Sequence, residues 1–355
     1  MREIEVNIPE RSYRIIVGKG ILKDIPEFIG SPSKILLITD GILHSLYGKT
    51  LETILKEKFT IESFFLPPGE KGKNIKWALE ILRKAILSSF DRYSLFLCLG
   101  GGSVGDTGGF ASSIYMRGVR YIQLPTTLLA MVDSSIGGKT AVDFYGKNIV
   151  GTFHQPSLVI SDITTLKTLQ ERNYLNGFAE VIKYGIIKDP SIFTLLKENR
   201  ENILQREGLL EELIYRCAKI KAEVIEKDEK EKGLRMILNF GHTIGHALEA
   251  KSNFKLWHGE AVSLGMIAAT YISYTMGMVS KEILKELEDL LSLYSLPTRY
   301  SRFSPSDLKE FLRRDKKIRK GKIRFVLMKN LGEVEIKEDI PESLIEESLE
   351  YLRKG

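Results

Sequence analysis

The stretch Ser94-Leu-Phe-Leu-Cys-Leu-Gly-Gly-Gly-Ser-Val-Gly-Asp106 decides the fold of this chain. Residues 94–99 predict a buried strand because five apolar residues follow one another there, and the glycines behind them predict a tight turn into a helix. Residues 100–105 match the pattern G-x-G-x-x-G, in which glycines allow backbone N–H groups to approach phosphate oxygens. A strand, such a turn and a helix in succession indicate an α/β protein with a nucleotide-binding site.

The glycine turn alone leaves a second interpretation open, because glycine-rich turns between a strand and a helix also arise from close packing. This turn follows the third expected strand rather than the first. No acidic residue lies about 20 residues further on, where the dinucleotide fingerprint has one. Other segments must therefore decide between the two interpretations.

Short apolar runs alternate with amphipathic stretches on both sides of the turn. We expect further strands at residues 34–39, 61–66, 121–124 and 158–161, and helices over 46–58 and 74–90, the second with Asn74 as its N-cap. This alternation of strands and helices predicts a parallel sheet that binds ligands at the carboxyl ends of its strands. From residue 171 to 293 nearly every segment has helical spacing, and residues 323–328 and 332–336 predict a late hairpin.

Composition excludes several classes of protein. The 355 residues are 43% hydrophobic and 28% charged, as in ordinary globular proteins. The 52 Lys and Arg exceed the 46 Asp and Glu only slightly and are mixed with them, so we expect an anionic small substrate and no nucleic acid. Two cysteines, Cys98 and Cys217, cannot form a disulfide framework and indicate the cytoplasm.

Two segments bear on targeting and membranes. Residues 1–9 contain no apolar run that could serve as a signal peptide. Residues 261–280 are 20 uncharged residues, long enough to span a bilayer, but their many hydroxyl groups favour a buried helix in a helical domain. We therefore expect no membrane association.

The segment Pro125-Thr-Thr-Leu-Leu-Ala-Met-Val-Asp-Ser-Ser-Ile-Gly-Gly-Lys-Thr-Ala-Val-Asp143 gathers polar groups among glycines, and Gly146-Lys-Asn148 follows it. A solvated loop is one interpretation. The compact glycine-rich pattern favours a binding role instead, with the threonines capping a helix or holding a ribose or phosphate.

Three of the five histidines lie within 17 residues, at positions 242, 246 and 258. On a helix His242 and His246 share one face, as the histidines of zinc sites do. Spacing leaves open which two histidines bind a metal and whether Glu180, Glu249 or Glu260 completes the set. The nearby pair Glu180 and Lys183 is either a surface salt bridge of little energetic value or a buried functional pair.

Four blocks in this order resemble the 3-dehydroquinate synthase family of sugar-phosphate cyclases. They are the 100–106 and 125–139 segments already described, Ala179-Glu-Val-Ile-Lys-Tyr-Gly185 and Asn239-Phe-Gly-His-Thr-Ile-Gly-His-Ala-Leu-Glu249. The resemblance runs from residue 40 to about residue 322. It implies a Rossmann-like NAD-binding α/β domain with a mostly parallel sheet over 1–168, and a mainly α-helical metal- and substrate-binding domain over 169–355.

The resemblance also implies site residues. Glu180, His242 and His258 would hold a divalent metal, Zn²⁺ or Co²⁺, with His246 facing the substrate. NAD would be bound by Asp40, Glu70, Lys73, Gly102, Ser103, Val104, Gly105, Asp106, Thr126, Thr127, Lys139, Lys147, Thr165, Leu166, Lys167 and Thr168. The substrate would contact Asp133, Lys139, Asn148, Lys183, Lys221, Arg235, Asn239, His246 and Lys317 (or its neighbour Lys316), and Arg117 would reach the neighbouring subunit's site in a homodimer.

The implied reaction converts 3-deoxy-D-arabino-heptulosonate 7-phosphate, a phosphorylated sugar acid, into 3-dehydroquinate and phosphate. Transient oxidation by NAD, β-elimination of phosphate, reduction and an intramolecular aldol closure would follow one another. The alternatives are another NAD- and metal-dependent sugar-phosphate cyclase, a polyol dehydrogenase with net NADH production, and a non-catalytic binding protein. The cationic residues favour a substrate with a carboxylate, because they would otherwise lack a partner.

Overall fold

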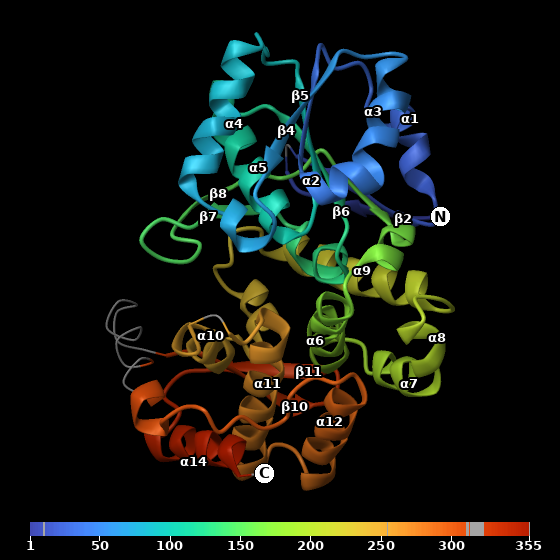
Figure 1. The fold of residues 1–355 in the computed structure, drawn as a ribbon. Helices are drawn as coiled ribbons and strands as arrows, with labels where there is room; N and C mark the ends of the chain where they lie inside the picture. The colour runs from blue at the N-terminus through green and yellow to red at the C-terminus, as the bar shows by residue number, and fades with distance from the viewer. Residues whose placement is uncertain (10, 254, 310–311, 313–322, 355) are drawn as a thin grey trace. The chain divides into compact units, whose positions relative to one another are not determined.

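The computed structural model describes residues 1–9, 11–253, 255–309, 312 and 323–354 (Figure 1). The chain forms two compact units: Met1–Gln170 with Leu210–Lys230, and Glu171–Leu209 with Glu231–Gly355. The expected domains, 1–168 and 169–355, differ from these units in two respects. The first unit runs to Gln170 rather than to residue 168. Residues Leu210–Lys230, expected in the helical domain, pack with the α/β unit.

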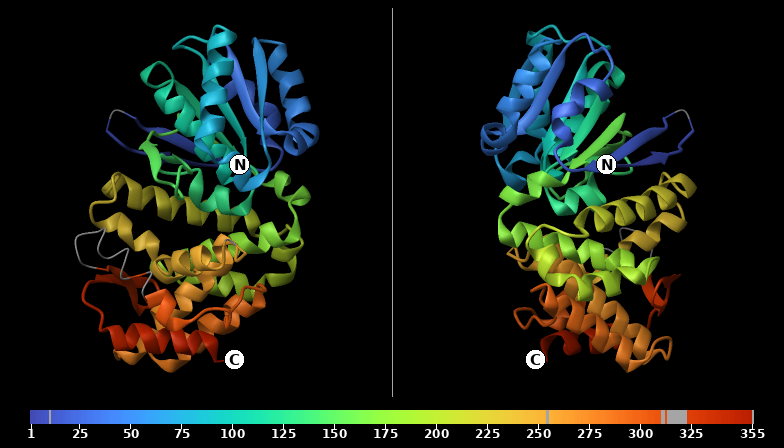
Figure 2. Two further views of the ribbon diagram at one scale, coloured as in Figure 1. Left: turned by 60° about the vertical axis from the view of Figure 1, so that its left-hand side comes forward. Right: turned by 90° about the vertical axis from the view of Figure 1, so that its right-hand side faces the viewer.

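The first unit is built on a seven-stranded sheet. Its order is β1 (Arg2–Val6), β2 (Tyr13–Gly18), β9 (Leu158–Asp162), β6 (Arg120–Pro125), β5 (Leu95–Gly100), β3 (Ile35–Asp40), β4 (Ile61–Leu66). All neighbours are parallel except β1 and β2, which form an antiparallel edge (Figure 2). The mostly parallel α/β fold and the five expected strands are confirmed. Strands β1 and β2 were not predicted, although the alternation of glutamates and apolar residues in β1 is typical of a half-buried strand.

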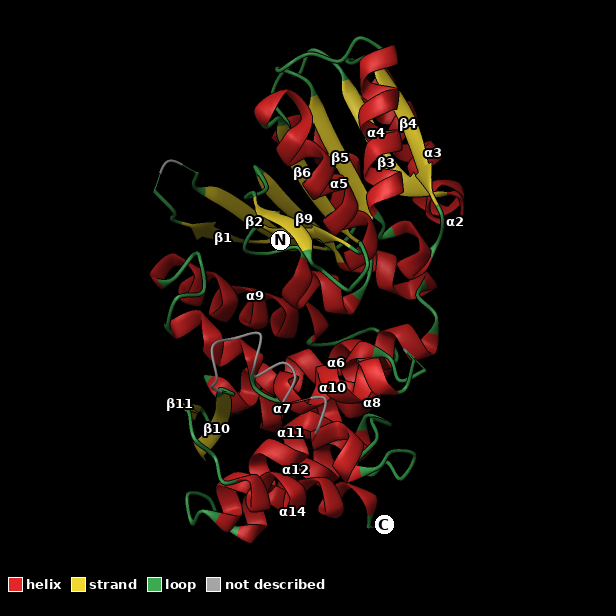
Figure 3. Ribbon diagram, turned by 90° about the vertical axis from the view of Figure 1, so that its left-hand side faces the viewer, coloured by secondary structure: helices red, strands yellow, loops and turns green. Residues whose placement is uncertain are grey.

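Helices cover both faces of this sheet, which explains the continuous apolar runs of its inner strands. Ile35 and Leu37 of β3 pack with α3 (Lys49–Lys56), while Leu36 and Ile38 pack with α4 (Ile75–Leu87) and α5 (Gly102–Ile114). Figure 3 shows α4 and α5 lying over the strands. Asn74 caps α4 as predicted, its Oδ1 accepting a hydrogen bond from Lys76 N at 3.0 Å.

Two further pieces complete the first unit. Helix α9 (Leu210–Lys227) packs on β1, β2 and the helical turn η5 (Ala130–Ser134). The strands β7 (Lys139–Val142) and β8 (Val150–Phe153) form a small antiparallel hairpin. This hairpin was not predicted, since glycines and polar residues surround its short strands.

The second unit is mainly helical, as expected. It contains α6 (Glu171–Ile187), α7 (Ser191–Glu198), α8 (Arg200–Leu204), η7 (Leu234–Asn239), α10 (His242–Lys251), α11 (His258–Thr275), α12 (Lys281–Leu293) and α14 (Glu342–Arg353). The late hairpin is present as β10 (Phe325–Asn330) and β11 (Glu333–Lys337). Helix α11 packs against α6, α10, α12, α14 and β10, so the uncharged run is a buried helix. Among the described residues no helix is long and apolar enough to cross a membrane.

Candidate functional site

The glycine turn lies where the order of the sheet reverses. After β3 the chain forms β4 at the outer edge and then returns to place β5 on the other side of β3. In doubly wound sheets ligands bind at the carboxyl ends of the strands at such a reversal. Asp40 ends β3 and Gly100 ends β5, so the reversal lies between them. The turn's place after the third expected strand is therefore no argument against a nucleotide.

The N-terminus of α5 offers bare backbone to a ligand. A Cβ atom on Gly101 would lie 3.0 Å from Thr127 Cγ2, and one on Gly102 would lie 3.0 Å from Ser134 Oγ. Within the described part of the chain no side chain caps this helix. Its first N–H groups can therefore bind an anion, which the helix dipole also favours.

A second turn, η3 (Gly69–Gly72), is bound to the same helix end. Ser103 Oγ donates to Gly69 O at 2.8 Å, and Lys73 Nζ lies 2.5 Å from Asp106 Oδ2. Burial acts to lower the pKa of Lys73, but Asp106 and then Glu70 raise it above its ordinary value. The structure thus brings Glu70, Lys73, Ser103 and Asp106 together at the N-terminal end of α5.

The remaining candidates of the first unit lie in its turns and its hairpin. Asp40 Oδ1 accepts from Ile42 N and Leu43 N at 2.8 and 2.9 Å. Tyr47, which the sequence did not single out, donates to Thr165 O at 3.2 Å and bonds Thr168 Oγ1 at 2.5 Å. It thereby holds the turn η6 (Ile163–Thr168), which contains Thr165, Leu166, Lys167 and Thr168. Thr126 and Thr127 follow β6, and Lys139 begins β7.

Lys221 and Asp133 form a contact within the first unit. Lys221 Nζ donates to Asp133 O at 2.6 Å and lies 3.0 Å from Asp133 Oδ1. Lys221 was expected in the helical domain, but helix α9 carries it to the α/β unit. Asn148 lies between β7 and β8 with a positive φ of 57°, its N–H donating to Asp143 Oδ1 at 2.8 Å.

Glu180, His242 and His258 converge in the second unit. Glu180 lies on α6, and the histidines are the first residues of α10 and α11. Glu180 Oε1 is 3.1 Å from His258 Nε2 and 3.4 Å from His242 Nε2. One potential ligand atom from each residue lies within 4.8 Å of the others, so the three could hold a metal ion.

Each of these three residues also has a polar atom that does not face the other two, and these atoms contact other groups. His242 Nδ1 is 3.1 Å from Phe240 O, and His258 Nδ1 is 3.7 Å from Glu249 Oε2. A proton on Nδ1 leaves the Nε2 lone pair for a metal. Lys183 pairs with Glu180 Oε2, and both side chains are almost fully buried. Burial acts to raise the pKa of Glu180, but Lys183 and His242 hold it well below its ordinary value.

The histidine spacing alone did not predict this grouping. The described residues contain a second potential group, His246 with Glu249 and His258, but neither group joins His242 to His246. The pair His242 and His246, which share one helix face, is thus not brought together with a third potential ligand among the described residues. His246 is exposed, with its ring centroid 5.1 Å from that of His242. Glu260 belongs to neither group.

Other candidates of the second unit lie on η7, just before His242. Arg235 is only 1% exposed, and Asn239 Nδ2 donates to Glu231 Oε1 at 2.6 Å. Lys317 and its alternative Lys316 lie outside the described residues, and Arg117 lies in the first unit with a positive φ of 67°.

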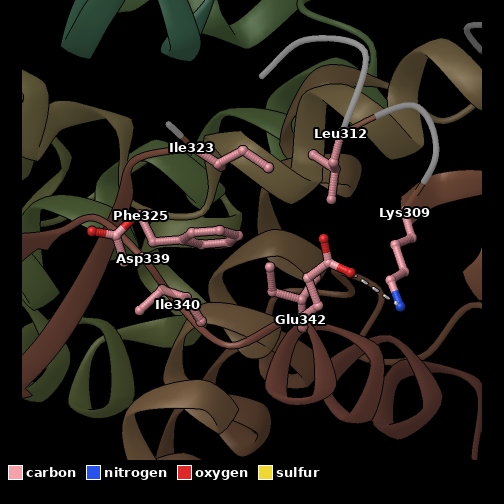
Figure 4. Close-up of a pocket in the computed structure, with 8 residues that line it drawn as sticks. Lys309, Leu312, Ile323, Phe325, Asp339, Ile340 and Glu342 are labelled. Atoms are coloured by element: carbon pink, nitrogen blue, oxygen red, sulfur yellow. Dashed lines mark ion pairs between the residues drawn. The ribbon is translucent and has the colours of Figure 1, made fainter. Parts of the chain in front are cut away.

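A separate pocket of the second unit contains none of these candidates (Figure 4). Apolar side chains form most of its lining, and Lys309 Nζ lies 3.6 Å from Glu342 Oε2 at its edge. The lining residues are Lys309, Leu312, Ile323, Phe325, Asp339, Ile340, Glu342 and Ile345.

The fold, the residues around the glycine turn and the cluster of Glu180, His242 and His258 together define a class of protein. Its members combine a doubly wound α/β unit with a helical unit that carries a candidate metal centre. Family models described as 3-dehydroquinate synthase N-terminal and C-terminal match residues 63–176 and 177–318. The chain belongs to the 3-dehydroquinate synthase family, which confirms the resemblance found in the sequence.

Relatives match over nearly the full length. The 3-dehydroquinate synthase of Dictyoglomus thermophilum is 45% identical over 353 residues, covering 98% of both chains. That of Thermodesulfovibrio yellowstonii is 43% identical and covers 96% of this chain and 97% of its own. The structure of 2-epi-5-epi-valiolone synthase from Streptomyces hygroscopicus, with NAD⁺ and Zn²⁺ bound, is 29% identical, covers 98% of both chains and has a TM-score of 0.90.

Proposed function

We propose that this chain is a carbon–oxygen lyase that converts 3-deoxy-D-arabino-heptulosonate 7-phosphate into 3-dehydroquinate and phosphate, a step of the shikimate pathway. One observation carries the proposal, namely that two features occur in the same chain. The N-terminus of α5 has no side-chain cap among the described residues and lies where the strand order reverses, and Glu180, His242 and His258 form a cluster of one carboxylate and two imidazoles. Relatives with 45% and 43% identity bear the name of this activity.

Glu180, His242 and His258 fit a divalent metal. One carboxylate and two imidazole nitrogens are a donor set that suits zinc and cobalt, and three protein ligands leave a position open for substrate. We propose these residues as the ligands of Zn²⁺ or Co²⁺. A bound metal would supply a Lewis acid that polarises substrate oxygens and lowers the barrier to oxidation. Lys183 contributes by fixing the second oxygen of Glu180.

The first unit fits NAD. The uncapped N-terminus of α5 suits the diphosphate, and Asp40 uses Oδ1 for backbone contacts, so Oδ2 can accept from a ribose hydroxyl. Bound NAD would supply the reversible hydride acceptor that a redox-neutral reaction needs. The remaining residues proposed for NAD are Glu70, Lys73, Gly102, Ser103, Val104, Gly105, Asp106, Thr126, Thr127, Lys139, Lys147, Thr165, Leu166, Lys167 and Thr168.

Cationic side chains would bind the two anionic ends of the substrate. Its carboxylate and phosphate suit lysine and arginine, and buried donors such as Arg235 and Lys183 can orient it without a large loss of side-chain freedom. Asn239 and Asn148 can bind hydroxyl groups, and His246 can donate or accept a proton. We propose the substrate contacts Asp133, Lys139, Asn148, Lys183, Lys221, Arg235, Asn239, His246 and Lys317.

We also propose a cytoplasmic homodimer in which Arg117 reaches the neighbouring subunit's site. Exposed apolar side chains close to Arg117 in sequence support the dimer, because Ile114 is 40% and Met116 48% exposed. Ile86, which is 65% exposed, lines the same surface hollow as these two residues. Both cysteines are buried, and two are too few for a disulfide framework, which supports a reducing compartment.

Phosphate release from 3-deoxy-D-arabino-heptulosonate 7-phosphate, with catalytic NAD and Zn²⁺ present, tests the proposal. We expect phosphate release without net NADH absorbance and its loss on adding a chelator. Turnover only of sugar phosphates without a carboxylate, such as sedoheptulose 7-phosphate, would instead identify another cyclase. Net NADH production would identify a dehydrogenase.

A further inference from the structure

Three side chains of α6, spaced one helical turn apart, contact the beginning of α11. Arg172 Nε and Nη2 donate to the two carboxylate oxygens of Glu260 at 2.7 and 2.9 Å. Asn176 Oδ1 accepts from Gly259 N at 2.7 Å and from Glu260 N at 3.3 Å. Glu180 then contacts the imidazole of His258. One stripe of α6, at positions i, i+4 and i+8, therefore holds the first turn of α11.

Asn176 supplies a cap that α11 lacks in its own sequence. Trp257 occupies the N-cap position, and its indole has no oxygen to accept a hydrogen bond. The N–H groups of Gly259 and Glu260, the second and third residues of the helix, need such an acceptor. Asn176 provides it from another helix, and its own side chain is buried, with 8% exposure.

The close approach of α6 and α11 explains why a glycine, Gly259, lies between His258 and Glu260. A Cβ atom on Gly259 would lie 2.0 Å from the backbone oxygen of Asn176, so a larger residue would push the helices apart. Glycine lets the α11 backbone reach the amide of Asn176. His258 directly precedes this contact, so the same contact fixes the position of its backbone.

We propose that Asn176 is a positioning residue of the metal centre. By capping α11 from α6, it holds His258 at the distance from Glu180 that a shared metal ion needs. Without the cap, the first turn of α11 frays, and His258, as its first residue, moves first. This inference rests on the metal centre assigned under the proposed function. It goes further because it assigns a role to a residue that binds neither metal nor substrate.

Titration of the full-length, metal-free protein with Co²⁺ tests this role. The dissociation constant comes from competition with a chelator, and the visible absorption of bound Co²⁺ reports the ligand geometry. For Asn176→Ala we expect a dissociation constant about 10- to 100-fold higher, the usual effect of losing an outer contact of a metal ligand, and an altered Co²⁺ spectrum. Asn176→Asp keeps the acceptor oxygen, so we expect it to restore both affinity and spectrum.

Asn74→Ala is the matched control. Asn74 also accepts one backbone N–H bond at a helix start, from Lys76 N at 3.0 Å, but it caps α4 in the other unit. We expect this control to lower the melting temperature of the metal-free protein without changing its Co²⁺ affinity.

The outcomes separate the inference from the function on which it rests. If the unaltered protein does not bind Co²⁺, the assignment of the metal centre itself is wrong. Normal binding by the unaltered protein and equal affinity in Asn176→Ala would leave the metal centre intact and overturn the positioning role. If Asn176→Ala does not fold, Asn176→Ser is measured in the same way. Its hydroxyl is too short to reach both N–H groups, so unchanged Co²⁺ affinity there would equally overturn the role.

Discussion

At the scale of single residues, Glu180 shows how one carboxylate can serve two purposes. Its Oε1 faces the two imidazoles, while its Oε2 is paired with the buried ammonium of Lys183. Lys183 therefore compensates the buried charge and leaves one oxygen for a metal. This division depends on the i, i+3 spacing in α6, which the sequence shows, and on complete burial, which the sequence does not show.

Glu180→Ala should abolish metal binding and also remove the carboxylate that pairs with the buried Lys183. We expect the free energy of unfolding of the metal-free protein to fall by about 3–5 kcal/mol, the range for breaking a buried ion pair. The double variant Glu180→Ala/Lys183→Met should regain part of this stability but no metal. Urea unfolding and metal analysis of the purified proteins provide the two measurements. Full metal content in Glu180→Ala would contradict the assigned ligand.

At the scale of the element, Glu52 joins helix α3 to strand β4. It accepts a hydrogen bond from Ser63 of β4 and lies 3.0 Å from Lys56 and 2.9 Å from His44 Nε2. Burial acts to raise the pKa of Glu52, but Ser63, Lys56 and His44 together lower it from 4.5 to about 2. The carboxylate thus takes up a proton more readily in the unfolded chain than in the folded one.

This pKa difference predicts a specific loss of stability in acid. Because the folded pKa is depressed, the stabilisation by Glu52 is present above pH 4.5 and disappears as the pH falls to about 2. Glu52→Gln should therefore be less stable than the unaltered protein at pH 7, and the difference should shrink by pH 3. Urea unfolding at both values measures it. Glu57→Gln, at an exposed carboxylate near the end of α3, is the control for the loss of one negative charge from this region.

The elements found from the sequence were those with a strong one-dimensional signal. Strands β3, β5 and β9 contain continuous apolar runs, and β4 and β6 are largely apolar. Asn74 precedes a regular amphipathic helix, and most of α11 lies in a long uncharged run. Helix α9 lies within the stretch 171–293 that was expected to be helical and to belong to the second domain, because its apolar face does not reveal which surface it covers. Asn176 lies at i, i+4 from Glu180, a visible signal, but its role depends on the close approach of α11.

At the scale of the whole molecule, the proposed dimer predicts an effect of the exposed apolar surface near Arg117. Ile86 is 65% exposed, so Ile86→Asp should leave the protomer folded and convert the dimer into monomers. Tyr274→Asp, at an apolar residue of the second unit that is 38% exposed, is the control and should remain dimeric. Sedimentation velocity measures both. A monomeric unaltered protein would contradict the dimer directly.

The path of the chain through its two units has a consequence for synthesis and dissection. The chain passes from one unit to the other at residues 170, 209 and 230, so the α/β unit is discontinuous. A ribosome must deliver residue 230 before this unit can be completed, even though most of it is translated by residue 170. A fragment ending at residue 170 would leave uncovered the surfaces of β1 and β2 on which α9 packs, and it would lack the partner of Asp133. Splitting this gene between the units should therefore yield two fragments of which the first cannot fold fully alone.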